Sequence, residues 1–200
     1  MALTSDLMRR GARRWGDRVA VECGDTSMSF AEVDAMSNRL AQALIAAGIE
    51  PQDSVALLVD NGPFSIPVDF ACLKARAIRV PLNARLAEAE HFAMLEQTSP
   101  KIIVASCGLR DRAEKLGSTF DVDVMILPEQ GASWPEWLVE ASDADPMLDT
   151  PPDDIVLALF TSGTTGTLKA SQHTQSSYAA VCANILANLC SPDRDDAMMH

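Results

Sequence analysis

The chain has 200 residues, of which 48% are hydrophobic, and its formal net charge is −12. A chain of this length can bury a substantial core and normally forms one domain, or one domain and part of another. The negative charge argues against nucleic acid or an anionic membrane surface as the main partner, although a nucleotide needs only a local positive charge. No apolar stretch is long enough to predict a transmembrane segment.

The first eighteen residues are rich in arginine, contain Asp6 and Asp17, and lack the apolar segment of a secretory signal. We therefore expect a surface helix here and a cytoplasmic protein. Five scattered cysteines without a CxxC pair are typical of free thiols in a reducing compartment, rather than of disulfides or zinc. The three histidines lie far apart, without metal-ligand spacing, so the sequence predicts no metal site.

A capping box marks the start of the next predicted helix. Ser29 stands at the N-cap position, and Glu32 follows three residues later. Apolar residues then recur at helical spacing as far as Leu44, and Gly48 with Pro51 beyond it predicts where the helix ends.

From residue 55 onward, short apolar runs alternate with helical patterns. The predicted strands lie at residues 55–59, 78–82, 101–106, 122–127 and 155–160. The predicted helices lie at residues 67–77, 87–97, 110–116 and 135–141. This alternation predicts an α/β fold, with a mostly parallel sheet flanked by helices. The acidic, proline-rich stretch 142–154 is interpreted as a solvated connector.

The most informative stretch follows the strand predicted at 155–160. It combines glycines, hydroxyl side chains and a lysine, and the residues assigned to a binding site are Thr161, Ser162, Gly163, Thr164, Thr165, Gly166 and Lys169. Glycines let successive amides point toward an anion, the hydroxyls add donors and the lysine adds a positive charge. A helix predicted to begin near Gln172 would add the favourable end of its dipole. Because ligands of open α/β sheets bind beyond the carboxyl ends of the strands, position and chemistry both predict a polyphosphate site.

Two other interpretations of this stretch are weaker. A P-loop has four residues between its glycines and a lysine directly after the second one, whereas here Gly163 and Gly166 are three apart and Thr167 follows. A Ser/Thr/Gly tract can also be a flexible linker or an exposed turn. A linker, however, does not need the preceding strand, the following helix or the placed Lys169, so we favour phosphate binding.

Residues 160–170 resemble the signature loop of the adenylate-forming superfamily, which contains acyl-CoA synthetases, luciferases and the adenylation domains of peptide synthetases. Residues 28–33 resemble the start of that family's first helix, and residues 73–83 resemble its second block. The three segments have the family's order and spacing, and residues 196–200 are similar to the strand before its next block. The resemblance covers nearly the whole chain but only the N-terminal part of a typical member.

Details favour the acyl-CoA ligase branch. Asn83 and the pair Thr164 and Thr165 are similar to acyl-CoA ligases, whereas peptide-synthetase domains more often carry an aspartate and a Ser-Thr pair there. The chain departs from the family pattern at four positions. Leu168 is found where the family usually has proline, and Ala170 where it has glycine. Gln175 is found where histidine is common, and Arg76 where glycine is usual.

The resemblance implies an enzyme of the acid–thiol ligase class. Such an enzyme activates a small-molecule carboxylate, here a fatty or aryl acid, with ATP and Mg²⁺, and then passes the acyl group to coenzyme A. It implies that the seven loop residues hold the β- and γ-phosphates, with no general acid or base among them, because a leaving pyrophosphate needs donors rather than proton transfer. The adenine and CoA sites, the magnesium ligand and the catalytic lysine are implied to lie beyond residue 200. No catalytic residue or metal ligand is therefore assigned here, and the 200 residues alone are expected to be inactive.

By the same resemblance, residues 1–53 form an N-terminal helical segment that would pack on a further subdomain, and residues 54–200 form an α/β subdomain carrying the loop 161–169. Apolar surface left without that subdomain predicts self-association. Two alternatives stay open: a non-catalytic nucleotide- or phosphate-binding module, and an adenylation domain that loads a carrier protein. An end within an apparent strand at 196–200 counts against the first alternative. The residues that favour the ligase branch count against the second.

Overall fold

The structure of the protein, a computed structural model, describes residues 4–162, 168–188 and 196. The elements in chain order are α1 (Asp6–Trp15), β1 (Val19–Cys23), β2 (Thr26–Ser29), α2 (Phe30–Ala46), β3 (Ser54–Leu58), α3 (Ser65–Lys74), β4 (Ile78–Pro81), α4 (Glu88–Thr98), β5 (Ile102–Ser106), the 3-10 turn η1 (Cys107–Leu109), α5 (Arg110–Phe120), β6 (Asp123–Leu127), α6 (Glu136–Val139), β7 (Ile155–Ser162), β8 (Leu168–Thr174) and α7 (Gln175–Asn188). None of the described helices is long and apolar enough to cross a membrane.

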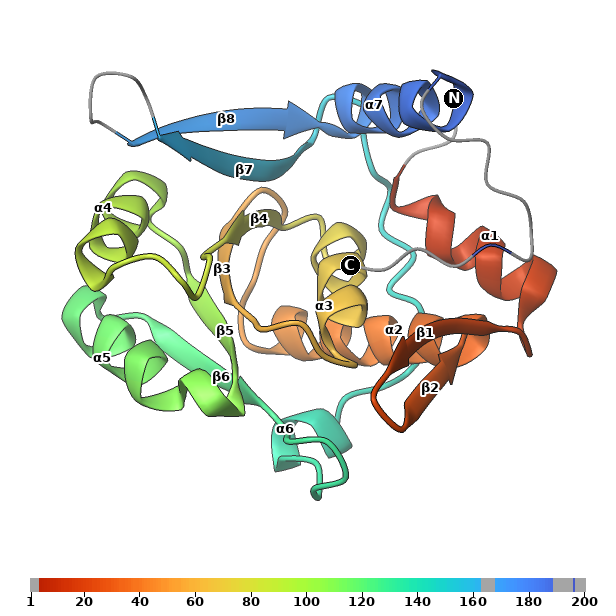
Figure 1. The fold of residues 1–200 in the computed structure, drawn as a ribbon, viewed down its shortest axis with the longest axis horizontal. Coiled ribbons are helices and arrows are strands. Elements are labelled where there is room, and N and C mark those ends of the chain that lie inside the picture. Colours follow the sequence, from red (N-terminus) through yellow and green to blue (C-terminus); the bar gives the residue numbers. More distant parts are fainter. Residues whose placement is uncertain (1–3, 163–167, 189–195, 197–200) are drawn as a thin grey trace.

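Within the described residues, strands β3 to β8 form one sheet in the order β6-β5-β3-β4-β7-β8, and β1 and β2 form a separate antiparallel hairpin (Figure 1). Neighbouring strands from β6 to β7 are parallel, and β8 runs antiparallel to β7 at the edge. The expected α/β fold with a mostly parallel sheet is therefore confirmed.

Helices cover both faces of this sheet, as the short apolar strands predict. One core layer joins α2 and α3 to β3 and β5 through residues such as Leu44, Val68 and Val104. The other layer joins α4 and α5 to the opposite faces of the same strands through residues such as Leu95 and Leu116. The alternation of buried side chains along β3 and β5 thus supplies both layers.

The N-terminal segment has the predicted surface helix, α1, and the predicted capping box. Ser29 Oγ accepts from the Glu32 amide at 3.2 Å, and the Glu32 carboxylate accepts from the Ser29 amide at 2.7 Å. Helix α2 packs on α3, and its Leu40 and Leu44 lie in the same core as β3. The division at residue 53 stays a prediction, and in this structure the two sides share a core.

Four sequence expectations need correction or completion. The helix expected near Gln172 begins at Gln175, because residues 168–174 form β8 instead. The hairpin β1–β2 was not predicted, and its strands are short and half-exposed. The stretch 142–154 is not merely solvated, because Asp145 and Asp154 pair with arginines. The strand expected at 196–200 lies, apart from Asp196, outside the described residues.

Candidate functional site

The predicted phosphate-binding stretch lies on a β-hairpin rather than between a strand and a helix. Strand β7 pairs with β4 at a single register position, Arg79 with Leu157, and from there to Ser162 it pairs only with β8. The hairpin β7–β8 therefore projects from the sheet as a two-stranded arm (Figure 1). Its two strands are joined by residues 163–167, so Gly163, Thr164, Thr165 and Gly166 lie outside the described residues.

Two of the assigned residues face each other at the end of this arm. Thr161 is the register partner of Lys169, and both side chains are exposed. Directly opposed residues of antiparallel strands project from the same face, with Cβ atoms about 5 Å apart. The arm thus presents a hydroxyl and an ammonium group side by side, next to the hydroxyl- and glycine-rich residues. Ser162 ends β7 opposite Leu168.

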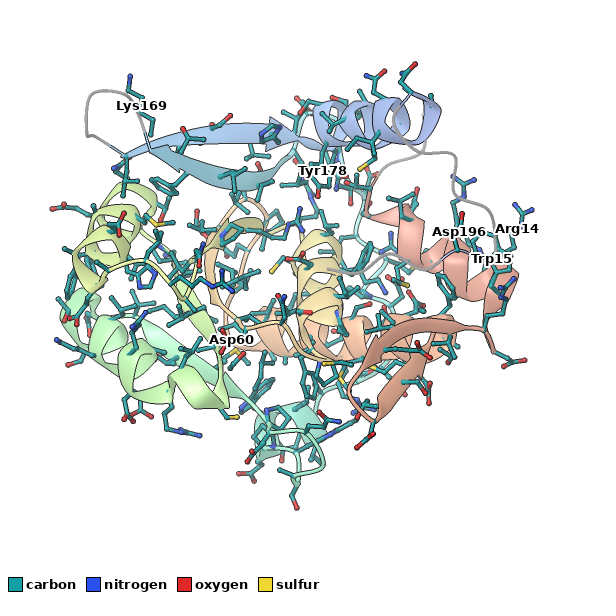
Figure 2. All side chains as sticks on the ribbon, viewed as in Figure 1. Arg14, Trp15, Asp60, Lys169, Tyr178 and Asp196 are labelled. Atoms are coloured by element: carbon teal, nitrogen blue, oxygen red, sulfur yellow. The ribbon has the colours of Figure 1, made fainter. Side chains whose placement is uncertain are left out.

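The two faces of the arm differ in chemistry. Phe160 and Leu168 pack on the core layer under α4, whereas Lys169 points away from that layer (Figure 2). Thr161 and Lys169, two of the residues assigned from the sequence, therefore face outward, on the side that the described part of this α/β unit does not cover. A phosphate bound there is open to solvent or to another part of the protein.

The helix dipole expected to assist the loop acts elsewhere. Helix α7 starts at Gln175, next to the base of the arm, because Thr174 pairs with Ile155 at the start of β7. Seven residues of extended strand separate the two ends of the arm, a distance of about 20 Å. The dipole field falls off within the first turn, so it does not reach the loop. Thr174 instead caps α7, and the missed signal is the capping pattern Thr174-x-x-Ser177.

A groove of about 960 Å³ opens beside the arm, at the carboxyl ends of β3 and β4. Its polar lining comes from the residues that follow these strands, including Asp60, Asn61 and Asn83, and its apolar wall includes Leu159 and Phe160 of the arm. Sequence analysis did not single out Asp60 and Asn61. The available signal was their place directly after a buried strand, where ligands of open α/β sheets bind.

A buried arginine lies where the arm joins the sheet. Arg79 is 5% exposed, and one of its Nη atoms lies 3.1 Å from a carboxylate oxygen of Asp69. Burial works to lower the pKa of Arg79, but the charge of Asp69 and the neighbouring Tyr178 outweigh it, so this pKa lies above its ordinary value. Arg79 is therefore a permanent positive charge at the base of the arm.

Over residues 4–162 and 168–188 and at Asp196, no group of three or more His, Cys, Asp or Glu side chains is placed to hold a metal ion.

The fold and the hairpin loop agree with the family match of the sequence. The chain belongs to the AMP-binding enzyme family, whose model matches residues 8–200. Its relatives include acyl-CoA ligases and adenylation enzymes.

Three similar proteins illustrate the range. A feruloyl-CoA synthase from an Amycolatopsis species is 32% identical over 187 residues, which are 92% of this chain and 36% of that protein. The long-chain-fatty-acid–CoA ligase FadD13 of Mycobacterium tuberculosis is 31% identical over 166 residues, 80% of this chain and 32% of that protein. The ATP-bound crystal structure of MatB from Rhodopseudomonas palustris has a TM-score of 0.78 at 25% identity, covering 91% of this chain and 37% of that one. The chain thus spans about a third of the length of these two curated relatives.

Proposed function

We propose that this chain is the N-terminal part of an ATP-dependent carboxylate–CoA ligase that works through an acyl-adenylate. The observation that carries the proposal is the hydroxyl- and glycine-rich connection at the end of the arm, in a chain of the AMP-binding family. Carboxylate activation is a property of the whole protein, of which this chain supplies the phosphate-holding portion.

The proposed phosphate site consists of loop and strand residues that share donor groups: Thr161, Ser162, Gly163, Thr164, Thr165, Gly166 and Lys169. The exposed pair Thr161 and Lys169 supports it, because a hydroxyl and an ammonium group on one face can contact neighbouring phosphate oxygens together. When bound, ATP supplies the α-phosphate that the substrate carboxylate attacks and the pyrophosphate that leaves.

Lys169 has the main electrostatic role in this proposal. Negative charge grows on the departing pyrophosphate, and a fixed positive charge beside it lowers the barrier. The hydroxyl and amide groups of the loop hold the same oxygens without moving protons, so none of them needs to act as an acid or a base. We propose that the protein ligand of Mg²⁺, the adenine and CoA sites and the catalytic lysine lie beyond residue 200.

The acyl substrate is proposed as a class only. The feruloyl-CoA synthase is named for an aryl acid and FadD13 for long-chain fatty acids, and this chain is about equally similar to both. We therefore propose a fatty or aryl carboxylate. The alternatives are an adenylation domain that loads a carrier protein and a nucleotide- or phosphate-binding module without catalysis.

Carboxylate-dependent ATP–pyrophosphate exchange by the full-length protein tests the proposal. Lys169→Met should slow adenylation by one to three orders of magnitude, about 1.4 to 4 kcal/mol. Lys101→Met is the matched control, because Lys101 is also an exposed lysine but lies before β5, outside the stretch 161–169. Unchanged exchange kinetics in Lys169→Met would contradict the role given to this lysine.

Two further measurements separate the alternatives. The intact mass of the protein from its source cell should be well over twice 21.5 kDa if a ligase continues beyond this chain. A mass near that value would favour the non-catalytic module. Acyl transfer to free CoA, but not to a phosphopantetheinylated carrier protein, would favour the ligase over the carrier-loading domain.

Two further proposals concern the location of the protein in the cell and its self-association. We propose a cytoplasmic location, which the free thiols of Cys23, Cys72, Cys107 and Cys182 support, since such thiols persist in reducing compartments. Self-association through surface left uncovered in the 200-residue chain stays a prediction, and size-exclusion chromatography of that chain beside the full-length protein tests it.

A further inference from the structure

The start of β7 is held to the sheet by side chains rather than by a strand ladder. Parallel neighbours in the sheet interior share several register positions, four between β3 and β4, whereas β4 and β7 share one. Besides the packing of Phe160 and Leu168 under α4, the arm that carries the phosphate-binding residues therefore depends on the contacts that fix residues 154–156, where β7 begins.

Three side chains from the β3–β4 region bind these three successive residues. The Arg76 guanidinium forms a two-pronged ion pair with Asp154, with Nε–Oδ2 at 2.8 Å and Nη2–Oδ1 at 3.2 Å. The Gln52 amide accepts from Ile155 N at 2.9 Å and donates to Ile155 O at 3.3 Å. Arg79 Nε donates to Val156 O at 3.2 Å. We call Gln52, Arg76 and Arg79 the β7 anchor.

Two of the anchor residues sit in an unfavourable backbone conformation. Gln52 has φ 72° and Arg76 has φ 58°, in the left-handed region that favours glycine. Such a conformation costs a non-glycine residue about 1 kcal/mol or more. Their backbones are also joined, because Gln52 N donates to Arg76 O at 2.8 Å. Glycine would adopt this conformation without strain, and the contacts of the two long side chains with β7 offset the local cost.

The third anchor residue ties the arm to the surrounding helices. The Arg79 guanidinium lies 5.4 Å from the centre of the Tyr178 ring on α7 and pairs with Asp69 on α3. Since α7 follows directly on β8, Arg79 holds both the first and the last part of the arm. The base of the arm is thus fixed from two sides, while its tip extends free of β4.

We infer that Gln52, Arg76 and Arg79 are positioning residues that fix the orientation of the arm and thereby the place of the phosphate-binding groups at its tip. This inference rests on the proposed function. The arm is about 20 Å long, so a tilt of about 5° at its base moves the tip by about 2 Å. A misplacement of 1 Å can slow an enzyme about a hundredfold.

Glycine substitutions give variants that should fold. Arg76→Gly and Gln52→Gly each remove contacts with β7 and at the same time relieve the backbone strain. The control is Asp121→Gly, which makes the same change at a left-handed position, φ 54°, at the end of α5 and away from the arm. Asp154→Asn removes the charge from the other side of the ion pair.

We expect the anchor variants, in the full-length protein, to raise the KM for ATP in pyrophosphate exchange by about tenfold to a hundredfold, with the KM for the carboxylate unchanged. Hydrogen exchange of the Ile155–Phe160 amides should become faster in these variants and stay at the wild-type rate in Asp121→Gly. Arg76→Gly combined with Asp154→Asn should have little more effect than either alone, because both remove one interaction.

The outcomes are distinguishable. Faster hydrogen exchange with an unchanged KM for ATP shows an anchor of purely structural importance and overturns the inference. The inference is also overturned if the hydrogen-exchange rate and the KM for ATP both stay at their wild-type values. If the wild-type protein has no carboxylate-dependent exchange at all, the proposed function fails and the positioning role fails with it. Exchange that responds to Lys169→Met but not to Arg76→Gly overturns the positioning role alone.

Discussion

The interior of the parallel sheet and the β7–β8 arm are held in place by different forces. Leu58 of β3 is fully buried, and β3 pairs with β4 and β5 at four register positions each. Leu159 of β7 is 43% exposed, and β7 pairs with β4 at one position. The sheet interior is stabilised by apolar burial, whereas the base of the arm combines the buried Val156 and Leu157 with contacts to polar and charged side chains.

This difference explains how the protein can expose the segment proposed to bind phosphate without losing its fold. Apolar burial is strong but requires a covered surface, whereas phosphate-binding groups must stay accessible. Directional hydrogen bonds at the base of the hairpin, together with the packing of Phe160 and Leu168 under α4, fix its orientation and leave Thr161 and Lys169 exposed. The contrast predicts that substitutions in the sheet interior change the stability of the protein, and that those in the arm change mainly its activity.

The largest expected loss of stability comes from replacing a charged side chain that is buried between two helices. Lys74 of α3 is buried and donates to Asp34 Oδ1 at 2.6 Å, to Ser37 Oγ at 2.7 Å and to Asn38, all on α2. Lys74→Ala should lower the free energy of unfolding by about 3 to 5 kcal/mol, because it leaves buried partners unpaired. Urea denaturation measures this value. A loss below 1 kcal/mol would show that α2 and α3 are joined by apolar contacts alone.

A pair of matched leucines tests the contrast directly. Leu58→Ala should lower the free energy of unfolding by about 2 to 4 kcal/mol, because it leaves a cavity between β3 and the helices of the second layer. Leu159→Ala in the arm should cost less than about 0.5 kcal/mol, as is usual for exposed positions. Both values come from the same denaturation experiment, and equal losses would refute the division between sheet interior and arm.

A smaller effect concerns the pairing of the N-terminal helix with the stretch 142–154. Burial works to raise the pKa of Asp145, but its bonds with Arg9, one of them 2.8 Å long, and with the Met147 amide outweigh it, so this pKa is lowered. Because the folded protein has the lower pKa, the pair contributes stability above the ordinary value of 3.8 and loses it as the pH falls through the lowered value.

Asp145→Asn should therefore cost about 1 kcal/mol at pH 7, and the difference from the wild type should shrink as the pH falls below 3.8. Urea denaturation at several pH values measures the two curves. A difference that stays constant down to pH 2 would exclude the pairing as its source.

The smallest effect concerns a buried thiol on α3, in the core layer that covers the sheet. Burial raises the pKa of Cys72 to about 12, and its side chain is fully covered. We expect Cys72 to resist maleimide at pH 8 until urea unfolds the protein, whereas the half-buried Cys182 on α7 reacts in the native state. Mass spectrometry of proteolytic peptides identifies the labelled sites. Labelling of Cys72 at the rate of Cys182 would indicate that the core around α3 opens readily.

Local patterns in the sequence predicted most of the α/β unit. The capping residues of α2 and the apolar runs of β3 to β6 lie close together in the chain, so their physical signals are local. Strand β8 escaped prediction, because an edge strand with one neighbour needs no alternating apolar pattern and its Leu168–Thr174 sequence is largely polar. The following helix was therefore expected too early.

The candidate site likewise has some features that the local sequence determined and others that the tertiary structure decided. The sequence by itself determined the chemistry of residues 161–169, since hydroxyls, glycines and a lysine in that order are a matter of composition and spacing. Tertiary structure decided that Thr161 and Lys169 share a face, that this face points outward, and that the α7 dipole lies at the other end of the arm. It also brought Gln52, Arg76 and Arg79 to the start of β7, from as far as 103 residues away along the chain. Such contacts depend on how strands are ordered in a sheet, which local sequence patterns do not encode.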